Sequence, residues 1–252
     1  MAPIIATESP FRRMPVDMPR RQILYFDALR LSAEIAGVAF DRLHNLLTGI
    51  TNRHDLLTDV TEQQEDKAVP AILDAYSIID SVNRFRELLQ VTPRLRHNSV
   101  FELFVRGTED IRELRRIVQH LNNREVDRIA QEGWAALGTL TWLGPSVVPD
   151  GPPSSYILQP GTFYPGQWTY GAMIDTYSSL GESEIADISL TTAGLRVNLS
   201  TIIDKLRSII RSLEGPLEEF AAGKERFRSD VLLIFALTPV QETGSIGDAD
   251  AT

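Results

Sequence analysis

Apolar residues recur every three to five positions through three long stretches of this chain, at about 19–48, 61–90 and 99–131. A stripe with this period covers one face of an α-helix and lets it pack on other helices. Pro70 falls inside the second stretch, where it is expected to kink or delay the helix. The dominant structure is therefore expected to be a bundle of long helices.

The composition and periodicity of the sequence change after Trp134. Residues 137–143 and 186–199 are rich in β-branched residues and partly alternate, which favours strands. Eleven Gly or Pro residues between 144 and 171 predict a long loop region with one short strand, SSYILQ. Ser200 is placed to cap a further helix. The expected class is mainly α with a small β elaboration before the last long helix, α+β overall.

The domain organisation follows from the absence of a clear linker. We expect one domain over 18–240, between a flexible tail at 1–17 and a disordered acidic tail at 241–252. Its expected parts are a helical bundle (18–135), a β/loop insertion (136–199), a returning helix (200–222) and a final buried segment (223–240).

Composition excludes several kinds of chemistry. With no cysteine, the chain can form no disulfide, thiolate nucleophile, Cys-ligated zinc site or iron–sulfur cluster. A net charge of −9 argues against a general nucleic-acid or anionic-membrane binder. The stretch 84–124 is an exception, because it contains nine arginines and only five acidic residues. A local anion-binding site is therefore compatible with the acidic chain.

No targeting or membrane segment is expected. The N-terminus lacks the apolar core of a secretory signal. The longest apolar run, VLLIFAL at 231–237, is far shorter than the roughly 20 residues that cross a bilayer. A cytoplasmic protein is expected, and 22 arginines against 3 lysines indicate a GC-rich, bacterial source.

The most informative motif is RRIVQH, which runs from Arg115 to His120, one of only four histidines. At 100° per residue, the apolar residues of 111–121 gather within about 60° of Leu114, and Arg116 and His120 share the opposite face. Arg115 falls at the boundary. This is the pattern of any amphipathic bundle helix, and it is also compatible with a functional site.

An arginine followed after four residues by a histidine, late in a helical bundle, resembles the Arg-x(4–6)-His motif of the HEPN superfamily. The resemblance covers about 20–135 and the helix at 201–213. It implies a four- to five-helix bundle and, in many members, a metal-independent ribonuclease of bacterial toxin, defence or RNA-processing systems; other members are inactive or only bind. The family commonly has Asn or Asp after the arginine, where this chain has Arg116.

The resemblance implies a site built without metal or cofactor. His120 would move a proton of the RNA 2′-hydroxyl, and Arg115 would hold the phosphate. Arg112, Arg116 and Asn123 are the expected nucleic-acid-binding residues beside them. Because HEPN ribonucleases commonly pair two motifs across a dimer, the resemblance also implies a homodimer with facing copies of this helix.

Other interpretations stay open at this stage. The chain could be a non-catalytic helical dimer with a protein partner. A small-molecule site could lie between bundle and β unit, lined by Trp134, Trp142 and Trp168. A metal site around His44 and His54 lacks helical ligand spacing and an HExxH motif, so capping or surface roles are favoured there.

Overall fold

The computed structural model describes residues 2–52, 62–93, 95, 99–121, 123–148, 150–161, 185–227 and 229–232. This part of the chain is mostly helical with a small β unit before the last long helix, as predicted, and the β unit is a four-stranded antiparallel sheet. None of its helices is both long and apolar enough to cross a bilayer.

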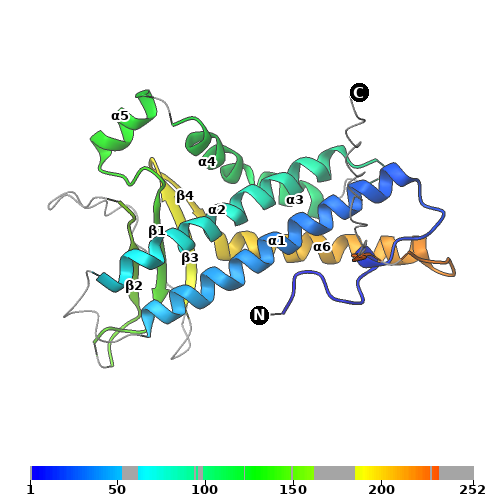
Figure 1. Cartoon of the computed structure of the whole chain (residues 1–252), viewed down its shortest axis with the longest axis horizontal. Coiled ribbons are helices and arrows are strands. Elements are labelled where there is room, and N and C mark those ends of the chain that lie inside the picture. The colour runs from blue at the N-terminus through cyan, green and yellow to red at the C-terminus, as the bar shows by residue number, and fades with distance from the viewer. Residues whose placement is uncertain are drawn as a thin grey trace, which may run out of the picture.

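Three long helices run side by side along the molecule (Figure 1). Helix α1 spans Arg20–Thr51, α2 spans Glu62–Val91 and α6 spans Leu199–Ala221. The buried residues of α1 recur every three or four positions, so that one stripe faces α2 and α6. Among them are three alanines that allow close helix approach: Ala33, Ala36 and Ala39. The bundle expected from the periodicity is confirmed, although α1 continues to Thr51, beyond the end expected at about residue 48.

The third helical stretch is not one helix, as the periodicity suggested, but three: α3 (Ser99–Arg106), α4 (Glu109–Gln119) and α5 (Asn123–Glu132). Gly107 separates the first two. A Cβ there would lie 2.9 Å from the carbonyl oxygen of Leu103 and 2.8 Å from Nζ of Lys205 on α6. The fixed obstacle to a side chain here is the Leu103 carbonyl, and the turn at Gly107 directs α4 onto α2 and the sheet.

The sheet has the strand order β2-β1-β3-β4, and every neighbouring pair is antiparallel. The strands are β1 (Thr139–Gly144), β2 (Ser154–Leu158), β3 (Ala186–Thr192) and β4 (Leu195–Asn198). Ala193 and Gly194, with φ of 46° and 77°, form the tight β3–β4 turn. Two consecutive residues with positive φ match the twist of a two-residue hairpin.

Trp142 on the central strand β1 connects the sheet to the bundle. Its indole Nε1 donates a hydrogen bond to the Thr51 hydroxyl at 2.8 Å, at the end of α1. Its ring stacks on Tyr156 of β2, with centroids 5.6 Å apart. Because the indole is fully buried, this bond satisfies a donor that would otherwise be unpaired in the core.

Helix α6 begins and continues differently from the sequence expectation. Its cap is Asn198, whose side chain accepts the amide of Thr201 at 2.8 Å, rather than Ser200. The pair Gly215-Pro216, which from the sequence is expected to interrupt the helix, lies inside it. Both residues are exposed, so water can hydrate the carbonyl that Pro216 leaves without an amide donor.

The first 17 residues are not a flexible tail, as their composition suggested. Ile5, Phe11 and Met14 are buried in the main core. The short 3-10 helix η1 (Pro10–Arg12) contacts α1 and α6, and the Ser9 hydroxyl donates to Glu214 of α6 at 2.6 Å. This segment therefore covers the end of the bundle that lies away from the sheet (Figure 1).

The segment after α6 is described as far as Leu232. Its amide at Phe227 donates to the carbonyl of Met14 at 2.8 Å, which pairs it with the N-terminal segment. Val231 and Leu232 are exposed, in contrast to the buried segment expected at 223–240, most of which lies outside the described residues. The predicted tail at 241–252 lies outside them as well.

Candidate functional site

Helix α4 carries the RRIVQH motif on the outside of the bundle. Its buried residues are Ile111, Leu114 and Ile117, and the helix contacts α2 and β4. These residues belong to the apolar stripe expected from the helical wheel. The polar face, with Arg112 and Arg116, points away from this contact and is exposed.

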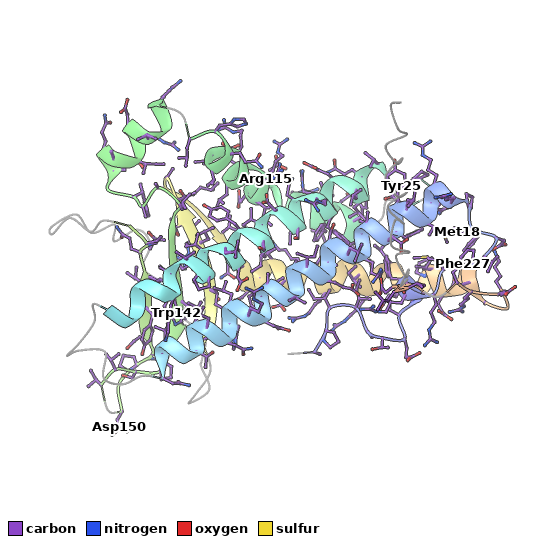
Figure 2. The ribbon with its side chains drawn as sticks, viewed as in Figure 1. Met18, Tyr25, Arg115, Trp142, Asp150 and Phe227 are labelled. Atoms are coloured by element: carbon purple, nitrogen blue, oxygen red, sulfur yellow. The ribbon has the colours of Figure 1, made fainter. Side chains whose placement is uncertain are left out.

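Arg115 is held at the edge of α4, where this helix passes α2 (Figure 2). Its Nε donates to Oδ1 of Asp80 on α2 at 2.8 Å. With the Gln119 amide assigned in the orientation that satisfies both groups, its oxygen accepts from Nη2 of Arg115 at 3.0 Å. The side chain is 36 % exposed, so the guanidinium is oriented by the protein and still reaches solvent.

The other two arginines of α4 also have carboxylate partners. Arg112 pairs with Glu109, and Arg116 donates to Glu113 through Nη2 at 2.6 Å and Nε at 3.0 Å. The hydrogen bond from Arg116 holds the pKa of Glu113 below its usual range. Helix α4 contains three arginines and three acidic residues, so its side chains carry no net positive charge. The excess of arginine counted over 84–124 therefore does not come from α4.

His120 occupies the C-cap of α4. Its backbone amide still donates to the carbonyl of Arg116 at 3.1 Å, but its own φ and ψ of −115° and 41° leave the helix. The side chain is exposed. The motif therefore ends at the point where the chain turns into α5. Asn123, predicted to contact nucleic acid, is the first residue of α5, and its side chain lies outside the described part.

The start of α4 is fixed by a residue that sequence reasoning missed. Arg86 of α2 is buried, donates from Nε to the carbonyl of Val105 at 3.3 Å and pairs with Glu109. A signal existed, because Arg86 falls within the apolar stripe of α2 between Val82 and Leu89. A charge at such a position indicates a buried ion pair. Asp80 offered no comparable signal.

The structure brings no metal site together in the part that it describes, where no cluster of three His, Asp or Glu residues could hold an ion. His44 lies on α1, with its ring tilted against Phe40 and its carbonyl accepting from the Thr48 hydroxyl at 2.8 Å. His54 and His97 lie outside the described residues.

Of the three tryptophans considered as a small-molecule site, Trp134 and Trp142 do not converge, and Trp168 lies outside the described residues. Trp134 lines an open, mostly apolar cavity of about 620 Å³ with residues of α5 and of the loop after β2. Trp142 is buried elsewhere, against Thr51 and Tyr156. Among the residues that the structure describes, no titratable side chain lines the cavity, so they offer no candidate for acid–base chemistry there.

The sequence matches no protein-family model, and searches of curated proteins and of solved structures return no significant match. The fold and site together define a helical protein with a small antiparallel sheet, in which a short helix carries Arg115 beside α2 and ends at the exposed His120.

Proposed function

We propose that Arg115 and His120 form an RNA-binding and RNA-cleaving site that is completed by a second copy of the chain, as in HEPN-like ribonucleases. This proposal rests on one observation, the orientation and solvent exposure of the Arg115 guanidinium. Asp80 and Gln119 orient its guanidinium, while it remains accessible five residues before an exposed histidine. Such an oriented arginine suits bidentate contact with a phosphate.

The reaction needs no metal. His120 of one copy takes the proton of an RNA 2′-hydroxyl, and O2′ attacks the adjacent phosphorus. The bond from phosphorus to the 5′-oxygen breaks, and a protonated His120 of the other copy gives that oxygen its proton. The products are a 2′,3′-cyclic phosphate and a 5′-hydroxyl. The remaining N–H groups of Arg115 stabilise the charge that develops on the phosphate.

This mechanism requires a second copy of the chain, because the base and the acid are two different histidines and each chain supplies only one motif histidine. A homodimer with facing α4 helices would supply two. In this proposal Arg112, Arg116 and Asn123 contact the RNA backbone, and the protein acts in the cytoplasm of a bacterium, in a toxin or defence context.

The test compares the wild type with His120→Ala and Arg115→Ala on a labelled single-stranded RNA. General acid–base catalysis is worth about 10²–10⁴-fold, so His120→Ala is expected to lower cleavage by at least about 100-fold while keeping RNA binding. Arg115→Ala should weaken both. Arg211→Ala, at an exposed position of α6, is the matched control. Equal cleavage by all variants would remove the catalytic assignment.

A second candidate is a non-catalytic dimeric interaction protein. The favouring observation is that all three arginines of α4 are paired with carboxylates of the same chain. In this case the wild type cleaves no RNA, and binding of a protein partner depends on the exposed face of α4. Loss of the partner in Arg116→Glu, with RNA cleavage absent throughout, would favour this candidate over the first.

A further inference from the structure

Helix α1 presents an apolar stripe to solvent on the side opposite its core. Leu24, Leu31, Ile35 and Val38 are between 46 % and 60 % exposed. Their spacings of seven, four and three residues place them on one face of the helix. No residue of the described chain buries this stripe, which is about 21 Å long at 1.5 Å per residue.

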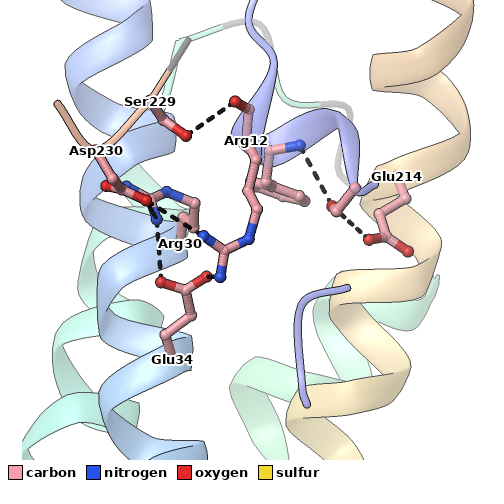
Figure 3. Close-up of polar contacts among 8 residues, drawn as sticks. Arg12, Arg30, Glu34, Glu214, Ser229 and Asp230 are labelled. Atoms are coloured by element: carbon pink, nitrogen blue, oxygen red, sulfur yellow. Dashed lines mark hydrogen bonds and ion pairs between the residues drawn. The ribbon is translucent and has the colours of Figure 1, made fainter. Parts of the chain in front are cut away.

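The segment that follows α6 is fixed to α1 beside this stripe. Asp230 accepts from both Nη atoms of Arg30, at 2.7 and 3.0 Å, and from Arg12 at 3.2 Å (Figure 3). The Ser229 hydroxyl donates to the Arg12 carbonyl at 2.9 Å. Arg30 is itself buried and also pairs with Glu34, so Asp230 completes a network of four charged side chains.

The network lies at the edge of the stripe. At 100° per residue, Glu34 is about 40° from Val38 and 60° from Leu31 around α1. The chain leaves Asp230 in a left-handed conformation, with φ of 61°. It continues as VLLIFAL, the longest apolar run of the sequence, and Leu232 is 83 % exposed where the described part ends.

We propose that the apolar segment 231–237 packs lengthwise on the α1 stripe formed by Leu24, Leu31, Ile35 and Val38, with Asp230 as its anchor. Seven extended residues reach about 23 Å, enough to follow the stripe in either direction from Arg30. The stripe and the described start of the segment, Val231 and Leu232, are apolar and exposed, so contact between stripe and segment removes apolar surface from water.

The small apolar area of the α1 stripe favours the segment 231–237, rather than a second copy of the chain, as the partner that covers it. Four half-exposed aliphatic side chains offer roughly a few hundred Å², the size of an ordinary patch on a monomer. A stable interface between two proteins needs about 800 Å² from each partner. A segment already tethered at the edge of the stripe needs much less, because its effective concentration is high.

The absence of native cysteine allows a direct test by disulfide trapping. Leu31→Cys is combined in the full chain with Leu233→Cys, Phe235→Cys or Leu237→Cys, because two cysteines bridge only when their Cα atoms lie within about 7 Å. At least one pair is expected to form an intrachain disulfide about tenfold faster than Leu73→Cys with the same partner. Leu73 is an apolar residue on α2 that is 58 % exposed, against 46 % for Leu31.

Hydrogen exchange gives a second measurement that needs no crosslink. Leu31→Lys and Ile35→Lys, both on the exposed face, are expected to speed exchange of the 231–237 amides about tenfold, whereas Leu73→Lys leaves it unchanged. Circular dichroism verifies that each variant folds. Equal trapping at Leu31 and Leu73 would overturn the proposal, as would interchain disulfides, which would assign the stripe to a second copy.

Discussion

Asp80 has two opposing effects on Arg115. It orients the guanidinium, and it also neutralises part of the charge that a phosphate would use. Because both side chains are at least one-third exposed, the pair contributes at most about 1 kcal/mol to stability. Its larger effect is expected on ligand binding.

Asp80→Asn is therefore predicted to leave stability nearly unchanged and to strengthen RNA binding several-fold at low salt. One additional unneutralised arginine should steepen the salt dependence of binding to single-stranded RNA by about 0.7 in log–log slope. Binding measured at several salt concentrations tests this. Asp204→Asn, which frees Arg207 on α6 from this ion pair, is the control. An unchanged slope in Asp80→Asn would contradict a role of Arg115 in phosphate binding.

Asp74 is a buried carboxyl on α2, and burial raises its pKa although Arg42 lies 3.3 Å away. The folded protein then holds this proton more tightly than the unfolded chain, whose Asp pKa is about 3.9. The charged form therefore costs stability above the folded-state pKa. This cost disappears as the pH falls toward the unfolded value.

Asp74→Asn is expected to stabilise the protein by about 1 kcal/mol at pH 7, because an amide avoids the desolvation of a charge. The gain should shrink toward pH 4. Urea unfolding at both pH values measures it, with the exposed Asp127→Asn as control. A destabilisation at pH 7 would mean that the Arg42 pair outweighs the burial cost.

At the scale of elements, two glycines make a matched pair. Gly107 turns α3 into α4 in a crowded position, while Gly49 lies inside α1, where a Cβ would meet nothing within 4 Å. Gly107→Ala is expected to cost about 1–3 kcal/mol through overpacking. Gly49→Ala should gain up to about 1 kcal/mol from helix propensity. Thermal unfolding of both variants provides the comparison, and a neutral Gly107→Ala would mean that the Lys205 side chain and the Leu103 backbone can move to make room for the methyl group.

The elements differ in how far the sequence could predict them. The helices α1, α2 and α6 could be predicted, because their buried apolar residues repeat with the helical period. The break at Gly107 could not, because the contact that Gly107 makes there is with Lys205 of α6, almost 100 positions later. In the candidate site the motif was visible, whereas Asp80 and Arg86 are brought to it by the packing of α2 on α4.

At the scale of the whole molecule, the N-terminal segment connects elements that are distant in sequence. Arg12 pairs with Glu34 of α1 and with Asp230 after α6, and Ser9 donates to Glu214 of α6. Beneath this polar layer, the ring of Phe11 contacts Phe26 edge to face at 5.9 Å. The burial of this segment could not be predicted from its sequence, which has several prolines and no periodic apolar pattern. A segment without regular secondary structure can bury side chains without such a pattern.

Removing residues 2–17 tests this role. The deletion exposes apolar faces of α1 and α6 and removes Arg12 from Glu34 and Asp230, so a loss of several kcal/mol is expected. Phe11→Ala is the milder variant and should cost about 3–5 kcal/mol, since its ring is fully buried. Both are measured by urea unfolding against a deletion of 241–252, which is predicted to be neutral. If deleting 2–17 left the unfolding midpoint unchanged, the segment would contribute no net stability. The core would then be supported by the helices and sheet alone.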